Sequence, residues 1–289
     1  MDDSKKNIKR PIVIGSGGFI GRHLVKTFNA QVYTHYRRAP FLLDLKAPSL
    51  ESLPIKECTH AIIAAGCADI NACTRLPEET HLINVKGTLE LTKQCIEKGL
   101  FPVLFSTDYV FDGQAGDYTE ESPLSPINVY GKQKAELEKC VTEITGGNHL
   151  ILRLSKIYST EKGSKTLIDE MVQHLIEGRP IRAAVDQVFC PLHVEDLMQC
   201  IKLLLEKGER GLFNCGGREK LSRYDLALKV AQALGVSEAL VEPISLDHLE
   251  GSPRPKATAL SSDKLYKTVL VNPQTIDQSI RLLTSRRKN

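Results

Sequence analysis

The sequence contains no tryptophan, only three methionines, and no apolar run that approaches the length of a membrane span. About 20 consecutive apolar residues are needed to cross a bilayer as a helix. The first ten residues are polar and charged, and they lack the apolar stretch of a signal peptide. We therefore expect a cytoplasmic protein without a membrane partner.

Neither sign of charge dominates, because 38 basic side chains face 35 acidic ones and the net charge is +3. The basic residues are scattered apart from a short tail at 286–288, so we expect no nucleic-acid partner. Of the 289 residues, 42% are hydrophobic. The chain is thus long enough for one large domain with a smaller one attached.

The eight cysteines include no CxxC pair. Cysteines scattered in this way are typical of reduced, buried thiols, so we expect neither a disulfide framework nor a metal site. They are Cys58, Cys67, Cys73, Cys95, Cys140, Cys190, Cys200 and Cys215.

The first half of the chain alternates short apolar runs with longer amphipathic stretches. This alternation indicates parallel βαβ units with helices on both faces of a sheet. Expected strands are 11–15, 31–35, 61–65, 102–105 and 149–154, and expected helices are 19–28, 84–98 and 128–142. In the second half we expect helices at 167–176, 194–205 and 221–234, and an extended piece at 211–215.

The predicted fold class is α/β, a Rossmann-type doubly wound parallel sheet with a smaller C-terminal α/β lobe. We place a dinucleotide-binding domain at residues 1–155. A substrate-binding lobe takes residues 156–289 and is interleaved with the first domain. Ser222 and Asp225 predict a capping box at the start of the third helix of the second half.

Three glycines, Gly15, Gly18 and Gly21, follow the first strand and open the first helix. The chain must turn sharply there, approach a pyrophosphate with its backbone, and pack the helix close to the sheet, and side chains obstruct all three. Free N–H groups at the helix start then bind the phosphates. This context predicts dinucleotide binding by the glycines and by Phe19 and Ile20 between them.

The end of the second strand carries no acidic residue of the kind that binds the ribose 2′-hydroxyl of NAD. It carries Arg37 and Arg38 instead. A guanidinium group matches the geometry of a 2′-phosphate, so we favour NADPH as the cofactor and leave NADH open.

Tyr130 and Lys134 lie four residues apart on the expected helix at 128–142, and therefore on one face. A neighbouring ammonium group is expected to lower the pKa of the phenol from its reference value of about 10. Thr107 ends the preceding strand and should face the same crevice. Thr107 and Tyr130 could then both hydrogen-bond one carbonyl oxygen that receives a hydride.

At these residues the chain resembles the dTDP-4-dehydrorhamnose reductases, which are extended short-chain dehydrogenase/reductases of deoxysugar synthesis. The resemblance covers most of the chain. It is carried by the glycine loop and by the segments at 43–45, 64–66, 83–88, 106–113, 128–134, 186–187, 194–197, 211–214, 254–255 and 260–261. The segments S-T-D-Y-V-F-D-G and N-V-Y-G-K-x-K are specific to this branch, whereas the glycine loop is not.

The resemblance implies a role for each matching residue. Thr107, Tyr130 and Lys134 would be the catalytic residues, with Tyr130 and Lys134 also contacting the cofactor. Asp108 would contact the sugar and Arg254 the substrate diphosphate. The remaining cofactor-binding residues would be Asp44 and Leu45 at the adenine, with Ala64, Ala65 and Gly66 lining the cofactor.

Two departures from the family pattern bear on the substrate. Cys67 and Ala68 stand where the family often has an aromatic residue and threonine. Lys156 stands where the family often places tryptophan against the sugar. We expect Lys156 to lie in the sugar pocket, where it would change how a sugar packs.

The main functional expectation is an NADPH-dependent reductase of a nucleotide-linked 4-keto deoxysugar. A related keto-sugar synthase or epimerase is the first alternative. A non-enzymatic subunit resembling the regulatory subunit of methionine adenosyltransferase is the second. Segment 272–289 is typical of an ordinary amphipathic helix rather than of a tail adapted to a partner. A homodimer stays open, and Glu195 alone does not indicate a metal that supports one.

Overall fold

A computed structural model describes residues 11–35, 37 and 39–287. Its centre is a seven-stranded sheet in which every neighbouring pair is parallel. Across the sheet the strands are β3 (Phe41–Leu42), β2 (Tyr33–His35), β1 (Ile12–Ile14), β4 (His60–Ile63), β5 (Phe101–Thr107), β6 (Leu150–Leu154) and β11 (Gly211–Cys215). The chain order reverses beside β1, so a crevice opens there at the carboxyl ends of β1 and β4.

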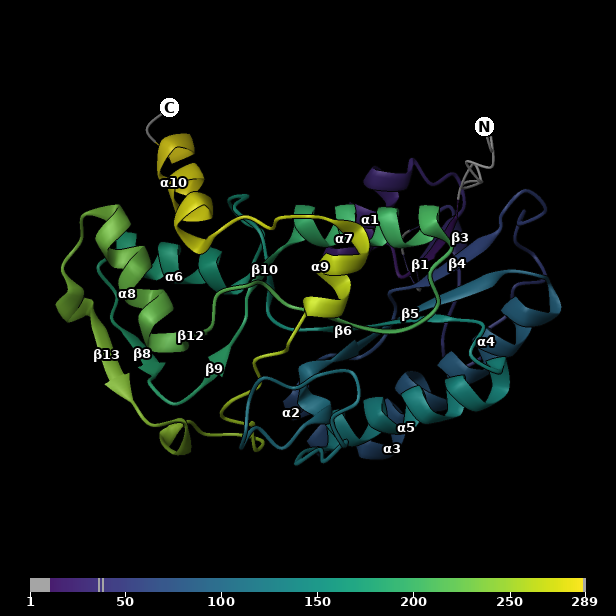
Figure 1. Ribbon diagram of the computed structural model, residues 1–289, viewed down its shortest axis with the longest axis horizontal. Coiled ribbons are helices and arrows are strands. Elements are labelled where there is room, and N and C mark those ends of the chain that lie inside the picture. The colour runs from purple at the N-terminus through teal and green to yellow at the C-terminus, as the bar shows by residue number, and fades with distance from the viewer. Residues whose placement is uncertain (1–10, 36, 38, 288–289) are drawn as a thin grey trace.

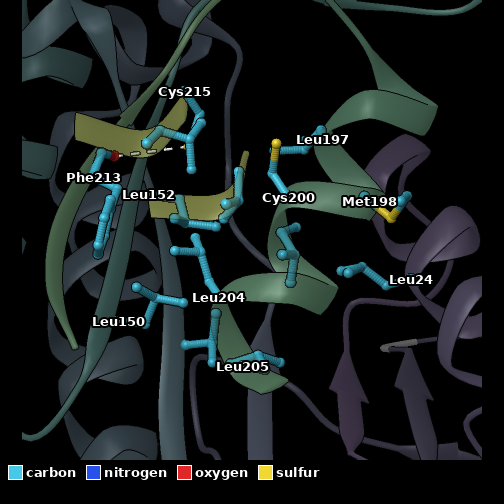
Figure 2. Close-up of a cluster of buried hydrophobic side chains, with 14 of the residues drawn as sticks. Leu24, Leu150, Leu152, Leu197, Met198, Cys200, Leu204, Leu205, Phe213 and Cys215 are labelled. Carbon is cyan, nitrogen blue, oxygen red and sulfur yellow. Dashed lines mark hydrogen bonds between the residues drawn. The ribbon is translucent and has the colours of Figure 1, made fainter. Parts of the chain in front are cut away.

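One face of the sheet is covered by α1 (Phe19–Phe28), α7 (Val194–Lys207) and α9 (Asp263–Val269), as Figure 1 shows. Figure 2 shows leucines of α7 packed toward β6 and β11, with Leu24 of α1 beside them. Apolar residues recur on α7 at helical spacing, and Leu197, Ile201 and Leu204 are fully buried. This burial fixes α7, and with it the second half of the chain, onto the sheet.

The opposite face is covered by α2 (Ile70–Arg75), α3 (Pro77–His81), α4 (Thr88–Glu97) and α5 (Val129–Thr145) (Figure 1). Leu91 and Cys95 of α4 and Leu137 and Val141 of α5 are buried against the sheet strands. Between α3 and α4 the chain forms a π-helical segment, Leu82–Gly87. Burial of both faces explains why the central strands are almost wholly apolar.

A smaller lobe is built around α6 (Leu167–Ile176), α8 (Arg223–Leu234) and α10 (Ile276–Arg287) and has a core of its own. Its strands β8 (Ile181–Ala184) and β13 (Val241–Ile244) pair in parallel. Short pairs, β7 (Ile157–Tyr158) with β10 (Leu192–His193) and β9 (Val188–Phe189) with β12 (Leu221–Ser222), accompany them. Short 3-10 turns lie at Asp108–Val110, Glu238–Leu240 and Leu246–His248.

The predicted fold class is confirmed by the parallel sheet with helices on both faces. The predicted helices 19–28 and 167–176 and the strand 211–215 have the observed bounds. The capping box is also present, because Ser222 and Asp225 bind each other's backbone N–H groups. Residues after 156 supply β11, α7 and α9, which complete the large sheet and cover one of its faces.

The predicted single helix at 84–98 is wrong in its first turn, where residues 82–87 are π-helical and regular α-helix begins at Thr88. A Cβ on Gly87 would lie 1.7 Å from the carbonyl oxygen of Leu45. The chain is therefore held against the neighbouring loop at this point, a tertiary contact that periodicity does not reveal. Among the described residues no helix has the length and apolarity to span a membrane.

Candidate active site

The glycine loop forms a turn that leaves no room for side chains. Gly15 has φ +91°, and a Cβ there would lie 2.5 Å from the backbone nitrogen of Ala65. A Cβ on Gly21 would lie 2.1 Å from the carbonyl oxygen of Gly15. Gly18 is the N-cap of α1 and supplies no side-chain cap. The first N–H groups of α1 therefore face a bare backbone turn, which is the form of a phosphate cradle.

A cavity of about 690 Å³ adjoins this turn. Most of the residues predicted to bind the cofactor line it: Gly15, Gly18, Arg37, Asp44, Leu45, Ala64, Ala65 and Gly66. His35, Lys46 and Glu79 also line it and were not predicted. The glycine turn, the uncapped start of α1 and the adjoining cavity all fit a dinucleotide.

The end of β2 shapes one side of this cavity. A Cβ on Gly17 would lie 2.3 Å from the ring of His35, so ring and glycine backbone are in close contact. The backbone N–H of Arg37 donates to Nδ1 of His35 at 3.0 Å. Arg37 is exposed at the cavity, while Arg38 lies outside the described residues. Arg37 thus lies where a phosphate on the ribose could be contacted.

A second cavity, of about 430 Å³, continues from the first, because Gly18 and residues 64–67 line both. It brings together residues predicted from separate motifs: Phe19, Ile20, Thr107, Asp108, Tyr130, Lys134 and Lys156. They come from the carboxyl ends of β5 and β6 and from the first turns of α1 and α5. We call this space the catalytic cavity.

The start of α5 is fixed by Asn128, whose side-chain oxygen accepts the N–H of Gly131 at 2.8 Å. Its amide group donates to the carbonyl oxygen of Pro253 at 3.0 Å, which joins α5 to the loop that carries Arg254. A Cβ on Gly131 would lie 2.1 Å from the carbonyl oxygen of Tyr109. The helix therefore packs tightly against the end of β5, and Tyr130 faces Thr107 across this contact.

A buried ion pair joins α5 to β6, and a hydrogen bond to the same carboxylate joins α5 to β5. Arg153 of β6 donates to the carboxylate of Glu138 on α5 at 2.8 Å, and the two side chains are 3% and 7% exposed. The hydroxyl of Ser106, next to Thr107, also donates to Glu138. Removing one partner would leave a buried unpaired charge, so this network fixes the strand end that carries Thr107.

Tyr130 and Lys134 have shifted pKa values in opposite directions. Burial, reinforced by the Asp108 carboxylate, raises the pKa of Tyr130, while the Thr107 hydroxyl acts against this rise. Burial also lowers the pKa of Lys134 to about 8, with the Glu138 carboxylate opposing the shift. The ammonium of Lys134 donates to the carbonyl oxygen of Phe105 at 3.0 Å.

The expectation that Lys134 brings the pKa of Tyr130 down is therefore wrong for the chain by itself. The phenolate form would lose hydration in the cavity and would be repelled by the Asp108 carboxylate, and the Thr107 hydroxyl offsets these effects only in part. Tyr130 consequently keeps its proton at neutral pH. A protonated phenol beside the Thr107 hydroxyl can donate a proton to a carbonyl oxygen.

Asp108 is 4% exposed and is held by two hydroxyl donors. Thr107 donates to one carboxylate oxygen at 3.0 Å, and Thr258 donates to the other at 2.7 Å. Burial raises the pKa of Asp108, and the positive charge of Lys156 acts against this rise. The carboxylate is therefore fixed in position beside the Thr107 hydroxyl.

Lys156 lies 5.6 Å from the centre of the Tyr109 ring, and the positive charges of Arg223 and Arg254 act on both Tyr109 and Lys156. We call these three residues the cationic cluster. Each of the three acts on the others by repulsion. Among the described residues, the only side-chain hydrogen bond that they donate is a 3.4 Å bond from Arg223 to Gln187. Many cationic donors without acceptors form a site for an anionic ligand.

Arg223 was not predicted as a site residue. It is the first residue of α8, and an arginine after a capping serine is typical of a solvated helix start. Only the packing of α8 brings Arg223 to Gln187 and within reach of the charges of Tyr109 and Arg254. Glu195, by contrast, lies 3.4 Å from His23 on α1 and does not line the catalytic cavity.

Comparison with known proteins places this geometry in a family. The model of the RmlD substrate binding domain matches residues 9–288. A dTDP-4-keto-6-deoxy-D-glucose reductase from Streptomyces niveus is 29% identical over 265 residues, covering 88% of this chain and 89% of that protein. Methionine adenosyltransferase 2 subunit beta from Rattus norvegicus is 28% identical over 276 residues, covering 89% and 81%.

A solved structure is also similar. The crystal structure of a hypothetical dTDP-4-dehydrorhamnose reductase from Sulfolobus tokodaii has a TM-score of 0.79 and 26% sequence identity. The match covers 93% of this chain and 98% of that one. The resemblance inferred from the sequence motifs is thereby confirmed, and the chain belongs to the RmlD substrate binding domain family.

Proposed function

We propose that this chain is an oxidoreductase that uses NADPH to reduce the 4-keto group of a dTDP-linked 6-deoxy sugar. The observation that carries the proposal is the catalytic cavity, where Tyr130, Thr107 and Lys134 meet between the glycine turn and the cationic cluster. The name of the Streptomyces niveus relative, a dTDP-keto-sugar reductase, supports the same substrate class.

NADPH would be held by the glycine turn and the cavity beside it, and when bound it supplies the hydride. Tyr130 donates a hydrogen bond to the oxygen of the substrate carbonyl, and Thr107 donates a second one when its hydroxyl proton turns from the Asp108 carboxylate to that oxygen. Tyr130 donates its phenolic proton to that oxygen as negative charge develops there. Lys134, fixed on the Phe105 carbonyl, favours the resulting phenolate by its positive charge.

A diphosphate fits the cationic cluster. Arg223 and Arg254 have donors in a planar fork that match phosphate oxygens, and they gain acceptors when a diphosphate lies between them. The diphosphate would place the attached sugar toward Thr107 and Tyr130. In this arrangement Arg254 binds the diphosphate, Arg223 assists it, and Asp108 and Lys156 contact the sugar.

The proposal is tested by incubating the purified chain with NADPH and a dTDP-4-keto-6-deoxy sugar, with product analysis by mass. Reduction of the keto group, with NADPH consumed in equal amount, supports it. A product of unchanged mass with a rearranged or inverted sugar would indicate the synthase or epimerase alternative instead. Consumption of neither substrate nor NADPH by a folded chain would reject an enzymatic role with this substrate.

A second candidate function is that of a non-catalytic subunit, favoured by the 28% identity to methionine adenosyltransferase 2 subunit beta. In this chain α10 buries Ile276, Ile280 and Leu283 in the core of its own lobe. That helix is therefore used by the fold of the chain itself. Co-elution with a methionine adenosyltransferase catalytic subunit on a sizing column, at micromolar concentrations, would support the second candidate.

A further inference from the structure

Lys156 directs an ammonium group into the catalytic cavity and finds no acceptor among the described residues. It follows β6, lines the cavity, and lies 5.6 Å from the centre of the Tyr109 ring. An ammonium group has three donors, and leaving them without acceptors away from water costs free energy. A ligand that enters the cavity is therefore expected to bring an acceptor to Lys156.

Among the carboxylates that act on Lys156, Asp108 has the largest effect on its pKa and favours the charged form. The two side chains attract each other, yet they form no ion pair within 4.0 Å. Thr107 and Thr258 each occupy one side of the carboxylate and hold it in place. Both side chains line the catalytic cavity, so a fixed acceptor and a donor without an acceptor are open to the same ligand.

The charges around this space select the kind of group that fits it. A carboxylate would be repelled by Asp108, and an ammonium would be repelled by Lys156 and by the arginines of the cationic cluster. A hydrogen atom or a methyl group would leave both Asp108 and Lys156 without a new partner. A hydroxyl group satisfies both, because it donates to the carboxylate and accepts from the ammonium.

The position of this hydroxyl on the sugar follows from Thr107. The Thr107 hydroxyl lies 3.0 Å from the Asp108 carboxylate, and the proposed mechanism places the reacting carbonyl oxygen against Thr107. The group between Asp108 and Lys156 therefore belongs to a carbon beside the carbonyl. In a 4-keto-6-deoxy sugar, one neighbouring carbon carries the 3-hydroxyl and the other carries the methyl group.

We propose that Lys156 and Asp108 together select substrates with a hydroxyl group beside the reacting carbonyl, and discriminate against 3-deoxy and 3-amino sugars. The proposal rests on the proposed function for the orientation of the sugar. Lys156 is here a specificity-determining residue, since it contacts the substrate beside the reacting atoms without taking part in proton or hydride transfer.

The test measures binding rather than turnover, so it can fail independently of the proposed function. Two dTDP-linked 4-hydroxy-6-deoxy sugars, one with and one without the 3-hydroxyl, are titrated calorimetrically into the wild-type chain and into Lys156→Met. The wild type should bind the 3-hydroxy sugar about 10- to 100-fold more tightly, the range expected for hydrogen bonds to charged groups. Lys156→Met should lower this preference about threefold or more by weakening binding of the 3-hydroxy sugar alone, while the hydrogen bond to Asp108 keeps part of the preference.

Lys162→Met is the matched control, because Lys162 is an exposed lysine six residues away, and it should keep the wild-type preference. If Lys156→Met does not fold, Lys156→Gln, which retains a neutral donor, should give an intermediate preference. Equal binding of both sugars by the wild type, or equal weakening of both by the variant, would overturn the proposal. A wild type that shows the preference but never reduces a keto sugar would reject the proposed function alone.

Discussion

At the scale of single residues, Tyr130 is buried in the catalytic cavity and keeps its phenolic proton at neutral pH. The pKa of its phenol is raised by burial and by the Asp108 carboxylate, so the proton is present at neutral pH. A proton donor in the reducing direction needs this state before each turnover.

Tyr130→Phe should lower turnover by roughly 10²- to 10⁴-fold, the usual cost of losing a general acid. Cofactor binding should stay nearly unchanged, because the glycine turn and its cavity keep their lining. Steady-state kinetics and a fluorescence titration with NADPH measure the two effects separately. Turnover near that of the wild type would remove Tyr130 from the mechanism.

Arg37 tests the choice of cofactor. Replacing Arg37 and Arg38 with alanine should weaken the binding of NADPH about tenfold or more and leave the binding of NADH little changed, because only NADPH carries the 2′-phosphate. Dissociation constants for both cofactors are compared in the wild type and the variant. Equal weakening of the two cofactors would show that these arginines do not bind the phosphate.

The lowered pKa of Lys134 predicts that the stability of the folded chain depends on pH. Its pKa is about 8 in the folded chain, against 10.5 for an unperturbed lysine. Between pH 8 and pH 10.5 Lys134 is protonated in the unfolded chain but mostly deprotonated in the folded chain. Its contribution therefore makes the free energy of unfolding rise with pH in this range, and it has no such effect below pH 8. The free energy of unfolding of the wild type, minus that of Lys134→Met, should rise by about 1–3 kcal/mol between pH 8 and pH 10.5.

Urea denaturation at several pH values gives this difference. Lys132→Met is the control, since Lys132 is exposed on the same helix, and it should show no comparable rise. A flat difference for Lys134→Met from pH 7 to pH 10.5 would contradict the lowered pKa.

At the scale of single elements, the unit β1–turn–α1 depends on two glycines in different ways. Gly21→Ala places a Cβ 2.1 Å from the Gly15 carbonyl oxygen and should destabilise the chain by about 2–4 kcal/mol. Gly18→Ala meets that oxygen at 3.5 Å, an ordinary contact, and should cost less than about 1 kcal/mol. Gly18→Ala should nevertheless weaken the binding of NADPH, because we expect the added Cβ to project into the phosphate cradle. Thermal unfolding and cofactor titration of both variants distinguish the two roles, and equal destabilisation would contradict them.

Some helices and strands could be predicted from the sequence, and others could not. The ten-residue helices α1 and α6, and the strand β11, have the bounds that the sequence predicts, because apolar periodicity and adjacent glycine or turn residues define them locally. Two-residue strands such as β3 and β12 are too short to have a period. The π-helical segment depends on the contact of Gly87 with the Leu45 carbonyl, which is distant in sequence.

At the scale of the whole molecule, the site is formed where the large sheet meets the smaller lobe. Thr107 and Tyr130 come from the sheet side, while Arg223 begins a helix of the lobe. Motifs in the first half of the chain therefore predicted the groups that lie together in the catalytic cavity. The cationic cluster was predicted only in part, because the burial of Arg223 is decided by how the lobe packs.

The central claim is that this molecule passes a hydride from NADPH to the keto carbon of a dTDP-linked sugar. The most direct measurement is incubation of the chain with a dTDP-4-keto-6-deoxy sugar and NADPH deuterated at the transferring position of the nicotinamide, with product analysis by mass spectrometry and NMR. The account predicts a reduced sugar with one deuterium bound to the former keto carbon, and loss of this product in Tyr130→Phe. An unlabelled product, or no product from a folded chain that binds both ligands, would contradict it.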